Sequence, residues 1–221
     1  MREPLIERLD ARSFFCRWLQ LSALAVVLLF SRGAEAQMEI VPASGSPLIA
    51  TKRSAAMPVP GWTRFCRQRP DECRVRSSEP ATVPLTPQAW DLLNRINRQV
   101  NASIIPISDY EHWGVEDRWD LAEDGYGDCE DFQLLKRKRL VAAGFPRKAL
   151  RMTAVIDDHG EAHAVLMVRA EKGDFVLDNK RDVILPWRQT GYVYLQREGS
   201  TGSTWVSLRR TFAPSVATSG R

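Results

Sequence analysis

The stretch Gly127-Asp128-Cys129-Glu130-Asp131 is the part of this 221-residue chain that best predicts its fold. It opens a segment of mixed apolar and charged residues that reaches Ala143 and is followed by Gly144 and Pro146. Glycine just past a helix, followed by proline, is typical of a helix end. The sequence therefore predicts a helix over 129–143 with the cysteine in its first turn. Its apolar residues cover more than one stripe, so we expect other elements to enclose it.

Beyond this helix the pattern changes to short apolar runs typical of strands. Strands are expected, separated by turn sequences such as Asp157-Asp158-His159-Gly160 and Lys172-Gly173, at 152–156, 163–168, 175–178, 192–196 and 205–208. We interpret this succession as an antiparallel meander.

Before the cysteine, Thr86-Pro87 is a helix start, with threonine as N-cap and proline at the first helical position. The spacing of Leu93, Ile96 and Val100 predicts a helix from Pro87 to about Asn101. Residues 102–126 are expected to be irregular, and their aromatic residues suit a cleft wall. Helices that precede a run of strands predict an α+β fold.

The N-terminal segment reads as an export signal. Four arginines precede the apolar run from Leu19 to Phe30, and Ala34-Glu35-Ala36 offers a cleavage site. We expect a signal peptide over 1–36, with an uncleaved anchor as the alternative. A flexible lead is expected over 37–60, the folded domain over 61–211 and a disordered tail over 212–221.

The cysteines agree with export to an oxidising compartment. Cys16 would leave with the signal, and Cys66 and Cys73 lie seven residues apart. An even pair plus one left over predicts a Cys66–Cys73 disulfide and a free Cys129. The alternative is two unpaired thiols.

The charge balance gives little reason to expect nucleic acid. The formal net charge is +4, and the only basic block is Lys136-Arg137-Lys138-Arg139. We interpret this block as a solvated helix face, with a polyanion-binding patch as the alternative.

Three residues suggest thiol chemistry: Cys129, His163 at the start of one expected strand, and Asp178 at the end of the next. A thiol nucleophile needs a base, and the base needs a group that orients it. Strands of a hairpin bring such ends together, although the register is not fixed by sequence. The competing histidines are His112, in the aromatic segment, and His159, expected in an exposed turn.

Acids surround the expected nucleophile. The start of a helix favours a thiolate, because unpaired N–H groups and the helix dipole point at it. Asp128, Glu130 and Asp131 oppose ionisation and raise the pKa of a thiol. A protonated His163 or a bound divalent cation would offset them.

The chain resembles the bacterial transglutaminase-like cysteine proteinase family. The resemblance covers roughly residues 60–210 and rests on Gly127–Phe132, Gly144–Pro146, Gly160–Leu166 and Asp174–Asn179, with support from Ile107–Tyr110, Trp119 and Leu185–Trp187. It implies a papain-like, transglutaminase-type core with Cys129 as nucleophile, His163 as base and Asp178 as orienting group. Some relatives are calcium-dependent periplasmic proteases that cut surface adhesins. In those, acids flanking the cysteine bind calcium, which makes Asp128 and Glu130 the candidate calcium ligands.

We therefore expect an exported thiol endopeptidase that processes a cell-surface or periplasmic protein. The alternatives are a transglutaminase-type acyl transferase and a non-catalytic periplasmic binding module. The expected partner is a protein or peptide substrate. We expect no nucleic-acid partner and no lasting membrane insertion after signal cleavage. The protein is expected to be a monomer.

Overall fold

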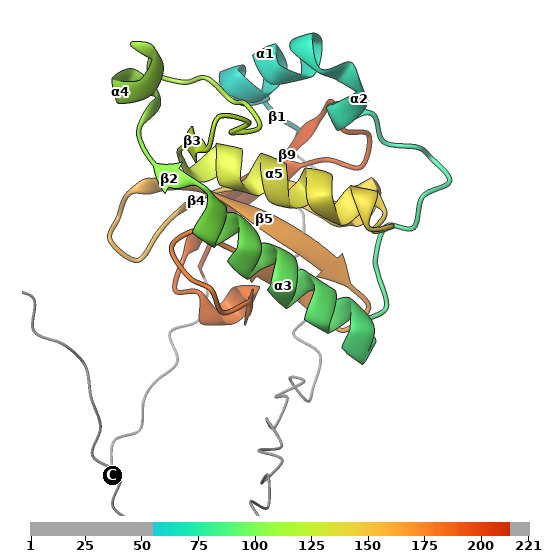
Figure 1. The fold of residues 1–221 in the computed structure, drawn as a ribbon. Helices are drawn as coiled ribbons and strands as arrows, with labels where there is room; N and C mark the ends of the chain where they lie inside the picture. The colour runs from blue at the N-terminus through green and yellow to red at the C-terminus, as the bar shows by residue number, and fades with distance from the viewer. Residues whose placement is uncertain (1–54, 213–221) are drawn as a thin grey trace, which may run out of the picture. The chain divides into compact units, whose positions relative to one another are not determined.

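The computed structural model of the protein describes residues 55–212 (Figure 1). The expected signal peptide and Cys16 lie outside the described residues, as do residues 37–54 and 213–221. Sheet pairing begins at Ala55, which is earlier than the start expected at Gly61.

Five α-helices and two short 3₁₀ helices occur in the described part of the chain. They are α1 (Pro60–Gln68), α2 (Pro70–Cys73), α3 (Pro87–Ser103), α4 (Asp109–Trp113), α5 (Cys129–Ala142), η1 (Arg147–Ala149) and η2 (Trp187–Gln189). Helix α3 starts as expected: Thr86 precedes it and its side chain accepts a hydrogen bond from the backbone of Ala89.

The strands form one seven-stranded sheet and one small parallel pair. The sheet strands are β1 (Ala55–Ala56), β4 (Leu150–Ile156), β5 (Ala162–Ala170), β6 (Gly173–Leu177), β7 (Leu185–Pro186), β8 (Val193–Glu198) and β9 (Trp205–Phe212). The pair is β2 (Ile105–Pro106) with β3 (Tyr126–Gly127).

The order across the sheet is β1-β9-β8-β4-β5-β6-β7, with antiparallel pairing throughout. The expected meander holds for β4, β5 and β6 but is wrong for β8. Strand β8 crosses back to pair with β4, because β7 already occupies the free edge of β6. Short apolar runs specify strands but not the order in which they pair.

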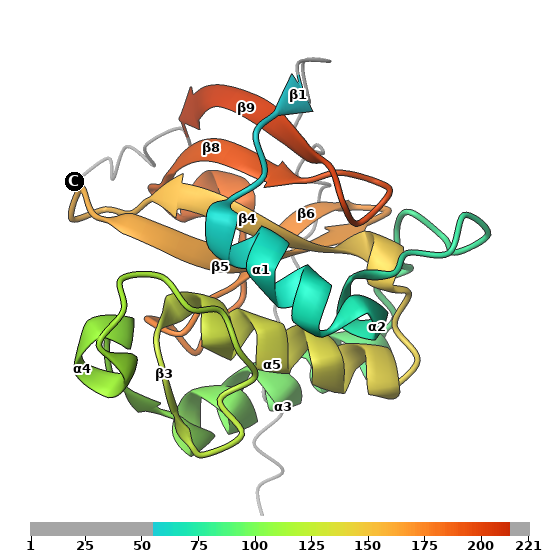
Figure 2. The ribbon, with the colours of Figure 1, turned by 90° about the horizontal axis from the view of Figure 1, so that it is seen from above.

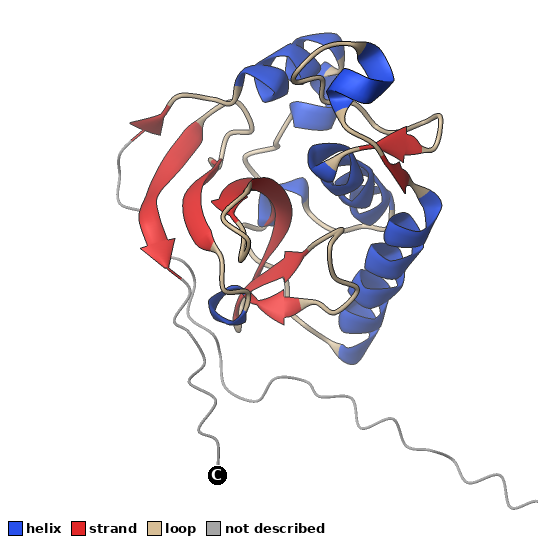
Figure 3. Ribbon diagram, turned by 90° about the vertical axis from the view of Figure 1, so that its left-hand side faces the viewer, coloured by secondary structure: helices blue, strands red, loops and turns tan. Residues whose placement is uncertain are grey.

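Both faces of the sheet are buried. Leu166 and Val168 point into the larger core, shared with α3 and α5, whereas Val165 and Met167 point into a second core. The second core contains Trp187, Tyr192, Tyr194 and Leu208 among others. Figure 3 shows the sheet curving away from the helices. Alternate residues of β5 therefore serve two cores, which explains its continuous apolar sequence.

Helices α3 and α5 lie next to each other on one face of the sheet (Figure 2). The α+β architecture predicted from the sequence is confirmed, and so is the prediction that the helix beginning at Cys129 is enclosed by other elements. Lys136 and Arg137, on α5, are 0% and 1% exposed, so the solvated helix face expected there is wrong for these two residues. Arg137 instead pairs with the buried Glu198 at 2.8 Å and lies 4.7 Å above the ring of Trp62.

Residues 102–126 are more ordered than expected, since they contain β2 and α4. Helix α4 begins with a capping box, in which Ser108 and Glu111 exchange side-chain and backbone hydrogen bonds. The prediction of irregular structure for these residues overlooked the capping box, which is a short local signal.

Cys66 and Cys73 form a disulfide that links α1 to α2, and Cys129 is a free thiol. Among the helices in residues 55–212, none combines the length and apolar character needed to cross a bilayer.

Candidate active site

His163 and Asp178 meet at one end of the β5–β6 hairpin. Leu166 pairs with Leu177, so the same register continued places Asp178 opposite Val165 and on the face that carries His163. The two side chains are diagonal neighbours, which lie within reach of each other across a sheet. Nε2 of His163 is 2.8 Å from Oδ1 of Asp178, and both side chains are buried. This contact leaves Nδ1 as the ring nitrogen available to receive a proton.

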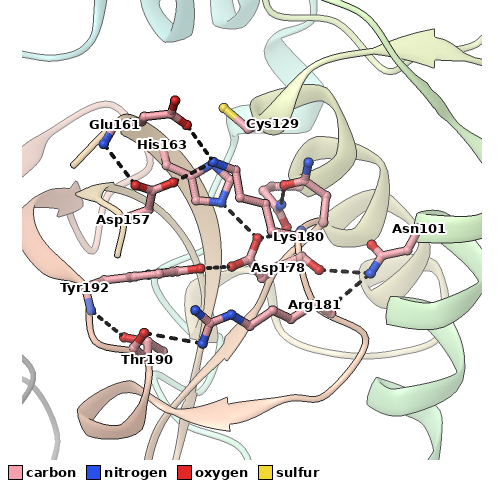
Figure 4. Close-up of polar contacts among 12 residues, drawn as sticks. Asn101, Cys129, Asp157, Glu161, His163, Asp178, Lys180, Arg181, Thr190 and Tyr192 are labelled. Atoms are coloured by element: carbon pink, nitrogen blue, oxygen red, sulfur yellow. Dashed lines mark hydrogen bonds and ion pairs between the residues drawn. The ribbon is translucent and has the colours of Figure 1, made fainter. Parts of the chain in front are cut away.

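The Asp178 carboxylate is surrounded by donors (Figure 4). The Lys180 backbone N–H donates to Oδ1 at 3.0 Å, and the Tyr192 hydroxyl donates to Oδ2 at 2.5 Å. Burial raises the pKa of Asp178, but the hydrogen bond and charge of His163 and the bond from Tyr192 outweigh it, so the pKa lies below its ordinary value. Asp178 is built to remain a carboxylate.

Cys129 is the first residue of α5, and its half-buried thiol lies against the start of β5. Burial raises the pKa of Cys129, and the backbone N–H of Ala164, the residue after His163, offsets only part of that rise. Figure 4 shows Cys129 at the end of the helix, on the same side of the site as His163. The fold therefore gathers the three residues expected from the sequence around the start of β5.

Acids dominate the other side of the thiol. Cys129 Sγ donates to Oε2 of Glu130 at 3.1 Å. Burial raises the pKa of Cys129 well above its ordinary value, and the charges of Glu130 and Asp128 add to the rise. Burial likewise raises the pKa of Glu130. Burial and the charge of Glu130 together raise the pKa of Asp128. Thiolate formation here needs compensating positive charge.

A second set of acids, Asp109, Asp128 and Asp131, converges beside the first turn of α5. One carboxylate oxygen from each lies within 4.8 Å of the others. Asp131 is 1% exposed; its Oδ1 accepts from the backbone of Asp120 at 2.7 Å. Burial is the main cause that raises the pKa of Asp131 to about 9, and it also raises the pKa of Asp109.

Two buried oxygens of this set, Asp128 Oδ1 and Asp131 Oδ2, lack hydrogen-bond partners among the described residues. Gly127 allows the approach, since a Cβ there would meet Asp131 Oδ2 at 2.7 Å. An all-oxygen set of carboxylates suits a hard cation such as calcium. Glu130 belongs to a set that includes the Cys129 sulfur, and its Oε2 is already engaged by the thiol.

The site contains residues that the sequence reasoning did not assign. Asp109 was named only within the motif Ile107–Tyr110. Asp131 was named only as an acid that opposes ionisation of the thiol, although Asp128 and Asp131 are three residues apart, and residues at that spacing are neighbours on a helix. Tyr192 was noted only as the start of an expected strand. Its contact with Asp178 depends on the path through η2 and has no local signal.

The two competing histidines lie elsewhere. His159 is exposed in the β4–β5 turn, as expected. His112 stacks on Trp113 with ring centroids 3.9 Å apart, and its Nε2 is 3.0 Å from Asp124.

The family described as "Bacterial transglutaminase-like cysteine proteinase BTLCP" matches residues 51–212. Similar solved structures include LapG of Legionella pneumophila in calcium-bound form, with 26% identity over 57% of this chain and 72% of that one, and a TM-score of 0.46. The EGTA-treated form of LapG has 27% identity over 56% and 69% of the two chains, with the same TM-score. No curated protein matches the chain.

Proposed function

Because this chain belongs to the bacterial transglutaminase-like cysteine proteinase family and is a cysteine peptidase, we propose that Cys129 is its nucleophile, His163 its base and Asp178 the group that orients the base. The observation that carries this assignment is the hydrogen bond between His163 Nε2 and Asp178, at the point where the thiol approaches Ala164.

The chemistry follows from the positions of these groups. His163 Nδ1 takes the proton from Cys129 Sγ, and the thiolate sulfur attacks the carbonyl carbon of a peptide bond. The C–N bond breaks, the imidazolium returns its proton to the leaving amine, and an acyl thioester remains on Cys129. Water, deprotonated by His163, then hydrolyses the thioester. Backbone N–H groups in the first turn of α5 are suited to stabilise the oxyanion.

The direct test is alkylation of Cys129 by iodoacetamide, followed by mass spectrometry. The wild-type thiol should react much faster than in His163→Ala, because only the wild type has the base. Equal rates in the two proteins would contradict the assignment. Cleavage of a peptide library provides the second measurement, and Cys129→Ala should abolish it while the thermal melting curve stays unchanged.

Acyl transfer is separated from hydrolysis in the same assay. With a primary amine present, a peptidase yields new N-termini and carboxyl ends, whereas an acyl transferase incorporates the amine. A non-catalytic module yields neither product. Hydrolysis is the expected outcome, since the family is one of proteinases.

We propose that calcium binds at Asp109, Asp128 and Asp131 rather than at Asp128 with Glu130 alone. The support is the pair of unpartnered buried oxygens on Asp128 and Asp131, and the all-oxygen character of the set. Bound calcium would supply the positive charge that the acids beside the thiol require. Asp128 is the residue shared with the pair expected from the sequence.

Calorimetric titration of chelator-treated protein tests this site. Asp131→Asn should lose calcium binding, whereas the matched variant Glu130→Gln, one residue away, should retain it. Loss of binding in Glu130→Gln alone would favour the pair expected from the sequence, and no binding by wild type would remove calcium from the proposal.

We further propose that residues 1–36 direct export, that the mature protein begins at Gln37 in the periplasm, and that its substrate is a cell-surface or periplasmic protein. The support is the arginine-rich start, the short apolar run and the Ala34-Glu35-Ala36 site. N-terminal sequencing of protein from a periplasmic extract should read Gln37 first; a retained Met1 in the membrane fraction would contradict it.

A further inference from the structure

Tyr192 contacts the proposed triad, although it takes no part in the proton transfers and bond changes of the proposed reaction. Its hydroxyl donates to Oδ2 of Asp178 at 2.5 Å, while His163 occupies Oδ1 at 2.8 Å. The rings of Tyr192 and His163 also meet edge to face, with centroids 6.0 Å apart and planes at 89°. Tyr192 thus contacts both the orienting acid and the base.

The position of Tyr192 is fixed by its surroundings. The side chain is 1% exposed, within the second core of the sheet. Its backbone N–H donates to Thr190 Oγ1 at 3.2 Å, and the Arg181 guanidinium lies 5.2 Å from the ring centroid. Figure 4 shows Tyr192 pointing at Asp178 from the side opposite Asn101. A rigid, buried hydroxyl of this kind holds its acceptor in one orientation.

We propose that Tyr192 is a positioning residue for the peptidase reaction, whose hydroxyl fixes the Asp178 carboxylate and keeps it ionised so that Oδ1 is presented to His163. The inference rests on the proposed roles of His163 and Asp178. It adds a fourth residue that acts through Asp178 and does not touch the substrate.

The physical need for this donor comes from burial. Asp178 is 3% exposed, and an isolated carboxylate in such a place would become neutral. The charged and titratable groups that face Asp178 are His163 from β5, Lys136 from α5, Tyr194 from β8, which senses its charge without a hydrogen bond to it, and Tyr192 itself. Burial raises the pKa of Tyr192, and the neighbouring Asp178 adds to the rise. The phenol therefore keeps its proton and remains a hydrogen-bond donor at neutral pH.

Tyr194 provides a matched control in the same core. It is also fully buried, but its hydroxyl contacts Thr190 Oγ1 at 3.0 Å and the Trp187 carbonyl at 3.2 Å, not Asp178. Tyr194→Phe therefore removes a buried hydroxyl of the same kind without removing a donor from the carboxylate.

The experiment follows the Asp178 carboxyl carbon by NMR in protein labelled with ¹³C-aspartate and saturated with calcium. Its signal is identified by its loss in Asp178→Asn. In Tyr192→Phe the pKa of Asp178 should rise by about 1 unit, because a hydrogen bond to the ionised form is lost. In Tyr194→Phe it should stay where it is in the wild type. An unchanged or lowered pKa in Tyr192→Phe overturns the proposal.

A second replacement preserves the fold if Tyr192→Phe does not. Site-specific 3-fluorotyrosine at position 192 keeps the ring and the hydroxyl but makes the hydroxyl a stronger donor. The pKa of Asp178 should then shift downward, opposite to the phenylalanine variant. A shift in the same direction, or none, contradicts a hydrogen bond that controls this carboxylate.

Cleavage assays connect the titration to the reaction and separate it from the proposed triad. The ratio of peptide cleavage at pH 4 to that at pH 8 should be lower in Tyr192→Phe than in wild type, because the raised pKa of Asp178 leaves more of its carboxyl protonated at pH 4, and it should not change in Tyr194→Phe. If Cys129→Ala cleaves as well as wild type, the triad fails. If Cys129→Ala is inactive and the ratio does not move in Tyr192→Phe, only the role of Tyr192 fails.

Discussion

Asp178 and Asp131 are both almost fully buried, at 3% and 1% exposed, yet they have opposite electrostatic character. Asp178 is met by donors on both oxygens, and its pKa lies below the ordinary value despite burial. Asp131 has one donor, stands among other acids and has its pKa raised to about 9, with burial as the main cause. Burial alone therefore does not decide whether a carboxylate is ionised; the groups opposite its oxygens do.

The difference suits two kinds of task. A carboxylate already satisfied by protein donors can orient a histidine without help. A group of carboxylates with unpartnered oxygens is under-compensated until a cation arrives. We infer that the side of the site containing Asp178 is prepared by the fold, and that the side containing Asp109, Asp128 and Asp131 is completed by an ion.

The largest expected effect is on the cleavage rate, and it tests the side of the site that contains Asp178. Asp178→Asn should lower the cleavage rate on the order of 10²–10⁴-fold, because an amide offers His163 a weaker and ambiguous partner. The loss should be smaller than that of Cys129→Ala, since Asp178 does not react. Initial rates on a library-derived peptide measure it, and a rate within twofold of wild type would break the comparison.

The second prediction concerns the pH dependence of stability on the side of the site that contains Asp109, Asp128 and Asp131. A carboxyl whose pKa is higher in the folded state than in the unfolded state stabilises most at low pH, and this stability is lost as pH rises. The raised pKa values of Asp131 and Asp109 therefore predict that the melting temperature of calcium-free protein falls between pH 5 and 7. Calcium at 100 times its Kd should restore about 2.7 kcal/mol.

The control for this prediction is Asp131→Asn. A neutral amide removes the titrating group, so the slope between pH 5 and 7 should be shallower and calcium should no longer stabilise. Melting curves followed by circular dichroism decide between the outcomes. A wild-type slope of the opposite sign would show that other carboxyl groups outweigh this set.

Local signals predicted much of this molecule. Thr86-Pro87 marked the start of α3, and Gly144 with Pro146 marked the end of α5 to within one residue. The approach of His163 to Asp178 was expected because a hairpin brings the start of one strand beside the end of the next, although the sequence did not fix the register.

What the sequence did not reveal depends on contacts between distant segments. Lys136 and Arg137 look like surface residues until α5 is enclosed, and Arg137 meets Glu198 from 61 residues away. Tyr192 reaches Asp178 only because the chain turns through η2 before entering β8. Asp109 joins Asp128 across 19 residues, through the pairing of β2 with β3. None of these contacts follows from periodicity or turn chemistry.

Lys136 gives the third prediction and a cationic counterpart to Asp131. Its Nζ is buried and has no hydrogen-bond partner among the described residues, and burial lowers its pKa to about 7. Between pH 7 and 10.5 the unfolded chain binds the proton more readily, so stability should rise with pH in that range. Lys136→Met should stabilise the protein by about 1–3 kcal/mol at pH 7.

Urea denaturation at pH 7 and pH 10 measures this effect, and the gain should be smaller at pH 10, where the lysine is already neutral in the folded state. Lys138→Met is the matched control, since Lys138 is half-exposed and its change should stay within about 0.5 kcal/mol. Destabilisation by Lys136→Met at pH 7 would show that attraction to Asp178 and Asp182 exceeds the cost of burial.

The smallest expected effect comes from Asp157, a buried carboxylate that resembles Asp178 in having several donors. Backbone N–H groups of His159 and Glu161 donate to its Oδ1 at 2.9 Å, and Lys180 Nζ lies 2.5 Å from its Oδ2. Burial raises the pKa of Asp157, but these donors together lower it below its ordinary value.

Lys180→Met leaves both backbone donors in place, so it should lower the free energy of unfolding by only about 0.5–1 kcal/mol. Because a lowered pKa stabilises above pH 4 and this stability is lost as pH falls, the cost should shrink toward pH 2. Urea denaturation at pH 7 and pH 2 measures both values. Calcium should not change the cost at pH 7, because a carboxylate that keeps its protein donors does not require an ion. Rescue of Lys180→Met by calcium would mean that Asp157 behaves like Asp131, and the distinction between the two kinds of carboxylate would then fail.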